Sequence, residues 1–266
     1  MSHRAANLAN LIKFMCCFSR PVISVSATNI FARAAEDGRQ FLVYSMTLNA
    51  KDDLAMVLPL PVKIGTGEKG IGFIDLSSYP DFFADLRKGF SLPPPPTASG
   101  FRSRSVAAAA KLEVVQVGRF EASFVPTVTD FSRLDERFRL PADAWNQLPD
   151  YRDYGFAVFK LKPGEAKIHP MAFSFPRRHT KTLFFPTVHI HDGKVHPKAG
   201  FDHGLYCQPL EHEPLQLRDW RESTGHAKGF MNVNKAKGLI MPDQHCYQKE
   251  MHGQLPNRDT FVSIAA

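Results

Sequence analysis

The chain has 266 residues, of which 44% are hydrophobic and 22% are charged, with 20 prolines and 17 glycines. This composition is typical of a folded globular protein and excludes a disordered tail, a collagen-like chain and a coiled coil. The formal net charge is +7, but the basic residues are scattered, which argues against a nucleic-acid-binding protein. No apolar run reaches the roughly 20 residues of a membrane-spanning helix.

Residues 1–20 form an N-terminal segment that is separable from the rest. Asn10 and Lys13 interrupt its short apolar stretch, so it lacks the core of a secretory signal. Met15 offers a second start besides Met1. We expect a cytoplasmic protein with reduced thiols.

Residues 21–90 form the first part of a single domain rich in β-structure. Apolar and β-branched runs bounded by turn formers predict strands at 21–26, 40–48, 54–60 and 71–76. Because Pro59 cannot donate a hydrogen bond to a ladder, the third strand must end there or lie at an edge. Three apolar side chains at helical spacing predict a helix over 79–88.

A Pro-rich and then Ala-rich stretch at 91–110 has no core pattern, and we expect a mobile surface loop. The remainder, 111–266, continues the same domain. It is predicted to hold short helices that begin at Asp130 and Pro141. Its predicted strands lie at 111–117, 120–125, 155–161, 168–175 and 183–191.

These elements predict an α+β fold, mainly antiparallel β-sheet and sandwich-like, with a few short helices. A G-x-G-x-x-G match runs from Gly65 to Gly70, but the residues after it resemble a strand rather than a helix. We therefore expect no nucleotide cofactor.

A histidine-rich stretch suggests a metal site. Asp192-Gly193 favours a two-residue hairpin turn, which would pair His189 with His196. Alternation then places His189, His191 and His196 on one face of the hairpin. Three imidazoles with an open position are typical of catalytic zinc or iron sites.

The first functional interpretation is therefore a metal-binding protein or metal-dependent enzyme that holds zinc or iron. His203 is the expected fourth ligand. The alternative is a non-catalytic β-rich binding or assembly module with surface histidines. Such a module would bind a protein partner or a second copy of the chain.

A third interpretation is an amidohydrolase with an N-terminal cysteine. If processing exposed Cys16, its thiolate could act as nucleophile and its α-amine as base. All residues before Cys16 would have to be removed. The competing interpretation is that Cys16 and Cys17 are small apolar side chains.

Several segments resemble a bacterial domain family of unknown function. The similarity covers about residues 40–192 and rests on the segments 54–62, 117–122, 148–161 and 169–176. In that family an apolar strand ends in proline-rich sequence, and a later apolar strand ends in Lys-Leu. The resemblance implies a sheet-rich domain and implies no activity.

Overall fold

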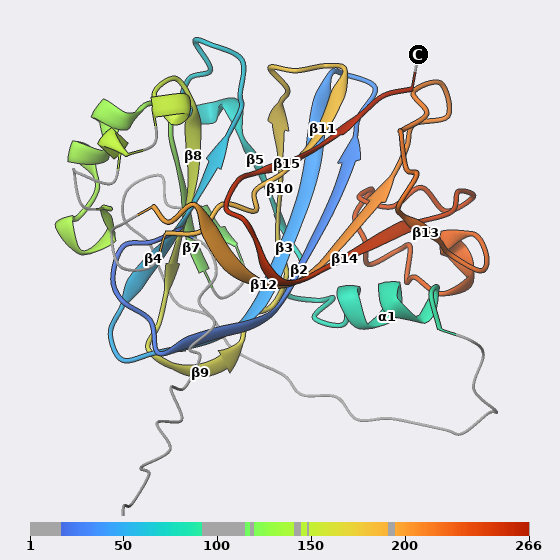
Figure 1. The fold of residues 1–266 in the computed structure, drawn as a ribbon, viewed down its shortest axis with the longest axis horizontal. Coiled ribbons are helices and arrows are strands. Elements are labelled where there is room, and N and C mark those ends of the chain that lie inside the picture. Colours follow the sequence, from blue (N-terminus) through green and yellow to red (C-terminus); the bar gives the residue numbers. More distant parts are fainter. Residues whose placement is uncertain are drawn as a thin grey trace, which may run out of the picture.

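Two β-sheets pack face to face and carry further segments on their outer surfaces (Figure 1). The computed structural model describes residues 17–91, 115–117, 120–140, 145–147, 149–190 and 195–265. Cys16, His191 and the Asp192-Gly193 turn therefore lie outside the described residues, as does nearly all of the loop expected at 91–110. No described helix is long and apolar enough to cross a membrane.

The larger sheet has eight strands in the described chain. Their order is β13 (Arg221–Glu222), β14 (Tyr247–Pro256), β12 (Lys198–Gln208), β2 (Ser24–Ala34), β3 (Arg39–Ala50), β10 (Met171–Pro176) and β5 (Gly72–Asp75), while β9 (Gly164–Lys167) also pairs with β3. Neighbouring strands are antiparallel except β12 and β2, which run parallel.

The smaller sheet has five described strands. Their order is β1 (Cys17–Phe18), β4 (Leu54–Leu60), β8 (Gly155–Leu161), β7 (Phe120–Val125) and β6 (Val115–Val117). Pro59 belongs to β4 and pairs with Phe156 of β8 on one side. The other neighbour, β1, reaches only Met56 and Val57. Pro59, which has no N–H to donate, therefore lies where β4 is an edge of the described sheet, as its sequence predicts.

A third sheet has two strands, β11 (Thr182–Phe185) and β15 (Thr260–Ser263). The buried Gln40 of β3 ties it to the larger sheet. Its Nε2 donates to the Phe184 carbonyl at 2.7 Å, and its Oε1 accepts from the Phe184 amide at 3.0 Å. Gln208 makes the same pair of bonds to the backbone of Met241 at 2.9 Å each. Each side-chain amide thus forms the two backbone hydrogen bonds that a neighbouring strand would form at one residue.

The main core lies between the two large sheets, where alternate residues of both are buried. Phe159 of β8 contacts Phe173 of β10 across this layer, with ring centroids 5.8 Å apart. A second cluster lies under α1 (Phe82–Lys88), which covers the outer face of the larger sheet at Phe31. The apolar periodicity of α1 and of the strands therefore accounts for three packed layers, which are α1, the larger sheet and the smaller sheet.

A third cluster lies on the outer face of the smaller sheet, under short 3-10 turns. The described 3-10 helices are η1 (Glu68–Gly70), η2 (Val128–Arg133), η3 (Glu136–Phe138), η4 (Pro149–Tyr151) and η5 (Ala227–Gly229). The helix predicted from Asp130 is thus two separate turns. The chain becomes extended at Leu134, and Asp135 caps the second turn by accepting from the Arg137 amide at 3.0 Å.

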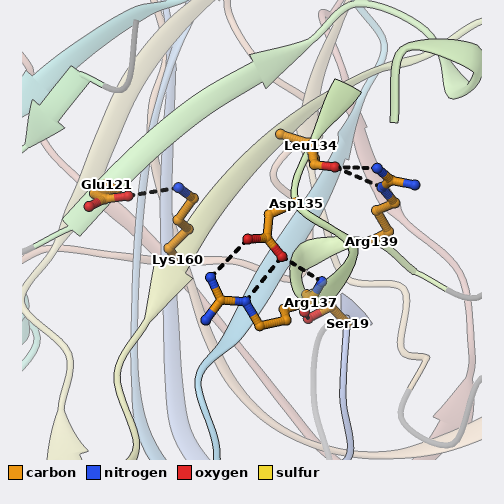
Figure 2. A network of polar contacts seen from close by, with 7 residues as sticks. All are labelled: Ser19, Glu121, Leu134, Asp135, Arg137, Arg139 and Lys160. Carbon is orange, nitrogen blue, oxygen red and sulfur yellow. Dashed lines mark hydrogen bonds and ion pairs between the residues drawn. The ribbon is translucent and has the colours of Figure 1, made fainter. Parts of the chain in front are cut away.

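A polar network fixes these turns to the smaller sheet (Figure 2). Ser19 donates to the Arg137 carbonyl and accepts from the Ala55 amide of β4, both at 2.9 Å. Arg137 also donates hydrogen bonds from two side-chain nitrogens to the Asp135 carboxylate. These bonds hold the pKa of that carboxyl well below its usual range. Lys160 of β8 bonds to Glu121 of β7 beside them at 2.7 Å.

The predicted sheet-rich, mainly antiparallel α+β class is confirmed. Strands β4, β7 and β8 have the predicted bounds. The sequence pattern missed β12 and β14, the two long strands that border the candidate site.

Candidate functional site

Two of the predicted metal ligands, His189 and His203, meet inside the molecule. Their residues are 2% and 0% exposed, and their Nε2 atoms lie 3.4 Å apart. Both rings pack against Phe201, which lies two residues before His203 on the same face of β12. Burial, and to a smaller extent the charge of His252, lower the pKa of His203 to about 3. His203 is therefore a neutral core residue.

His196 does not join this pair, because the predicted hairpin does not form a ladder at these residues. The Asn257 side chain occupies the place where strand pairing between His189 and His196 was expected. Its Oδ1 accepts from the His189 amide at 2.7 Å, and its Nδ2 donates to the carbonyls of His189 and His196 at 2.9 Å each. His196 is left exposed.

The interpretation as a metal-binding protein or metal-dependent enzyme is therefore wrong. Within the described ranges, no three His, Cys, Asp or Glu side chains are placed to hold an ion. The prediction of zinc or iron as a cofactor depended on such a group of three ligands. The prediction brought the histidines together by local strand pairing. Instead Asn257, more than 60 positions away in sequence, forms hydrogen bonds to the His189 amide and the His196 carbonyl, two of the backbone groups that this pairing needs.

Asp259, itself partly buried, is the centre of a second polar cluster. Its carboxylate accepts from the Tyr151 hydroxyl at 2.7 Å and from the amides of Thr187 and Val188 at 2.8 and 3.0 Å. Burial raises the pKa of Asp259 to about 6, although these three donors act against the rise. Burial and the nearby Asp259 carboxylate also raise the pKa of Tyr151. The cluster joins η4 and residues 187–188 to the turn between β14 and β15.

An open cleft of about 790 Å³ lies beside this cluster. We call it the β14 cleft; it is lined by residues of η4, β14, β15 and their connections, namely Asp150, Tyr151, Tyr154, Lys249, Glu250, Met251, His252, Leu255, Pro256, Arg258, Asp259, Thr260 and Phe261. Strand β14 pairs with β12 along its whole length, but β15 turns away to pair with β11. The two strands diverge, and the cleft lies where they separate.

The outer edge of β14 is open over most of its length in the described chain. The neighbour on that side, β13, pairs only with Tyr247 and Gln248. No described strand pairs there with Lys249–Pro256. From Lys249 to Leu255 the edge therefore presents backbone N–H and C=O groups that no described strand pairs with; Pro256 has no N–H, and its carbonyl accepts from the Arg258 amide at 3.1 Å.

The sequence of β14 carries only a weak signal of this site. Between Tyr247 and Leu255, β14 is mostly polar and has no β-branched residue, so it lacks the usual signal of a strand. The signal available was three less polar residues, Tyr247, Met251 and Leu255, at even spacing among polar ones.

No protein-family model matches the chain. No curated protein matches it either. Among solved structures, baculovirus P35 matches with 12% identity and a TM-score of 0.48, over 91% of this chain and 97% of that one. P35 from the caspase-8/P35 complex matches with 12% identity and a TM-score of 0.44, over 90% and 96%.

The resemblance to a bacterial domain family is therefore wrong, since no family model matches the chain. The TM-scores of the two P35 structures lie below 0.5, so these likenesses carry no argument about the activity or partner of this chain.

Proposed function

We propose that the protein is a binding module that takes up an extended segment of a partner protein along the open edge of β14. An unpaired strand edge recognises an extended peptide through main-chain hydrogen bonds, and pockets beside it select side chains. The observation that supports this proposal is the open edge of Lys249–Pro256 beside the β14 cleft.

The rigidity of the edge supports the same proposal. Ten residues of β14 pair with β12, and β12 is paired with β2 on its other side. An edge fixed in this way loses little conformational freedom on binding, which favours affinity. At about 3.3 Å per residue, the open stretch can accommodate a partner strand of six to eight residues.

The test is selection from a library of random twelve-residue peptides with the full chain as bait. Selected peptides are then added to the chain, and amide hydrogen exchange is measured. We expect slower exchange at the outward-facing amides of Lys249–Leu255. Peptides that slow exchange at another surface, or a selection without binders, would contradict the proposal.

A matched pair of variants checks the position of the binding site. Phe261 lines the β14 cleft and is 44% exposed, while Ile64 is 81% exposed and does not line it. Phe261→Ala should weaken binding of a selected peptide several-fold, because an apolar contact is lost. Ile64→Ala should leave that binding unchanged.

A further inference from the structure

We infer that one chloride ion binds in a small cavity between β11 and the end of β10, where Arg177 and Thr182 donate hydrogen bonds to it. We call this space the Arg177 cavity; its wall includes residues of β3, β10, β11 and β15 and of the turn between β10 and β11. It shares only Phe261 with the β14 cleft, so the inference does not depend on the proposed function.

Two buried hydrogen-bond donors belong to this wall and have no partner in the described chain. Arg177 is only 4% exposed, and its terminal nitrogens reach Glu213 at 3.3 and 3.4 Å, but its Nε has no partner there. The Oγ1 atom of Thr182 is also buried and has no partner among the described residues. A buried donor without a hydrogen bond is costly, so both atoms favour a bound ligand that accepts from them.

The size of the Arg177 cavity restricts the ligand to one small particle. The centre of a water molecule can move through about 10 Å³ of this cavity. That is room for one water molecule, or for a monatomic ion that is only slightly larger. Phosphate, sulfate and organic molecules are too large to enter.

The chemistry of the wall favours an anion over water. The Nε–H of Arg177 can only donate, and the Thr182 hydroxyl has a proton to donate as well. The Gln40 amide also lines the cavity, but its nitrogen and oxygen already bond to the backbone of Phe184. Much of the remaining wall is apolar, from Pro61 and three phenylalanines. A water molecule that accepted from both donors would direct its own hydrogens at this apolar surface, whereas an anion needs donors alone.

The charges around the cavity also favour an anion. Among the described residues, its wall contains Arg177 and Arg178 and no carboxylate. Each arginine has a carboxylate partner outside the wall, which is Glu213 for Arg177 at 3.3 Å and Asp153 for Arg178 at 2.8 Å. These carboxylates are 27% and 56% exposed, against 4% and 17% for the arginines, so water screens the negative charges more than the positive ones.

An ion at this place joins the third sheet to the larger one. Thr182 begins β11, while Arg177 directly follows β10 and forms an isolated backbone bridge with Val62. A ligand that binds only the folded protein stabilises it increasingly as the ligand concentration rises. Chloride should therefore raise the melting temperature of the full chain.

Thermal unfolding in two salts tests this expectation. The full chain is melted in increasing sodium chloride and, at equal ionic strength, in sodium gluconate, whose anion is too large for the Arg177 cavity. We expect a higher melting temperature in chloride, with a difference that grows with concentration. Equal melting temperatures in the two salts at every concentration would overturn the inference.

Three threonine variants locate the ion. Thr182→Val keeps the shape of the side chain and removes the hydroxyl, so the apparent chloride affinity should fall by about tenfold. Thr182→Ser keeps the hydroxyl and should keep the chloride response. Thr180→Val, at an exposed threonine that does not line the cavity, is the matched control and should also keep it. An equal loss of response in the two valine variants would disprove the contact with Thr182.

Crystals of the full chain grown in sodium bromide identify the ligand directly. We expect an anomalous bromide peak within hydrogen-bond distance of Arg177 Nε and Thr182 Oγ1. Electron density at that position without an anomalous signal would identify a water molecule and overturn the inference.

Discussion

Asp259, which is partly buried, and His203, which is fully buried, are titratable groups with opposite effects on stability. The folded-state pKa of Asp259 is raised to about 6, so in the acid range the folded protein holds a proton that the unfolded chain has lost. The pKa of His203 is lowered to about 3, so the unfolded chain takes up a proton that the folded protein does not. Acid therefore stabilises the fold through Asp259 and destabilises it through His203.

Asp259→Asn should remove a loss of stability that the protein undergoes as pH rises. The contribution of Asp259 is fully present below its unfolded pKa near 3.8 and is lost as pH rises through about 6. This loss amounts to roughly 2–3 kcal/mol. The neutral amide can still accept from Thr187 and Val188, so urea unfolding between pH 4 and 6.5 should show a flatter profile in the variant. An unchanged slope would contradict the assignment.

His203→Leu should have the reverse effect on the pH profile. Between pH 6.5 and 5 the unfolded imidazole is protonated while the folded one stays neutral, which costs the protein about 2 kcal/mol. Leucine cannot titrate, and it also removes Nδ1, a buried atom with no hydrogen-bond partner among the described residues. Urea unfolding should show that the variant loses less stability in acid; a greater acid loss than in the unchanged protein would count against this account.

Some of these contacts between distant residues could be predicted from the sequence. His189 and His203 were grouped as residues of one site, and they do meet. Their burial could not be predicted, since it comes from Phe201 and from the packing of two sheets. The bond between Tyr151 and Asp259 spans 108 residues, and no local pattern signals it.

At the scale of elements, Asn257 joins the turn after β14 to residues 189 and 196. Asn257→Ala removes three hydrogen bonds and should cost about 2 kcal/mol in urea unfolding. Hydrogen exchange at the His189 amide should become faster. Asn257→Asp keeps the acceptor but turns a carboxylate oxygen toward the carbonyls of His189 and His196, so it should be no more stable than the alanine variant. An alanine variant of full stability would show that the turn is held by other contacts.

Strand prediction succeeded where burial is local and failed where it is not. β4, β7 and β8 are apolar runs covered by their neighbours, so their bounds follow from composition. β14 is mostly polar and is held in place by β12 alone over most of its length. The helix predicted from Asp130 became two 3-10 turns, because Asp135 caps a new turn and binds Arg137.

For the whole molecule, Gln40 links the third sheet to the larger one by two hydrogen bonds to the backbone of Phe184. Gln40→Leu should cost about 3 kcal/mol, because it leaves the buried amide and carbonyl of Phe184 without these partners. Thermal or urea unfolding measures the loss. Gln254→Leu, at an exposed position of β14, is the control and should change stability by less than about 0.5 kcal/mol. Equal effects of the two changes would disprove the special role of Gln40.

The side-chain amides of Gln40, Gln208 and Asn257 each bind both backbone groups of one distant residue, and all three are uncharged. Dissolved ions screen attractions between exposed charges and have little effect on buried neutral hydrogen bonds. A chain of net charge +7 repels itself most at low ionic strength, and added salt relieves that repulsion without weakening these links. Its melting temperature should therefore hold or rise slightly from dilute buffer to physiological ionic strength.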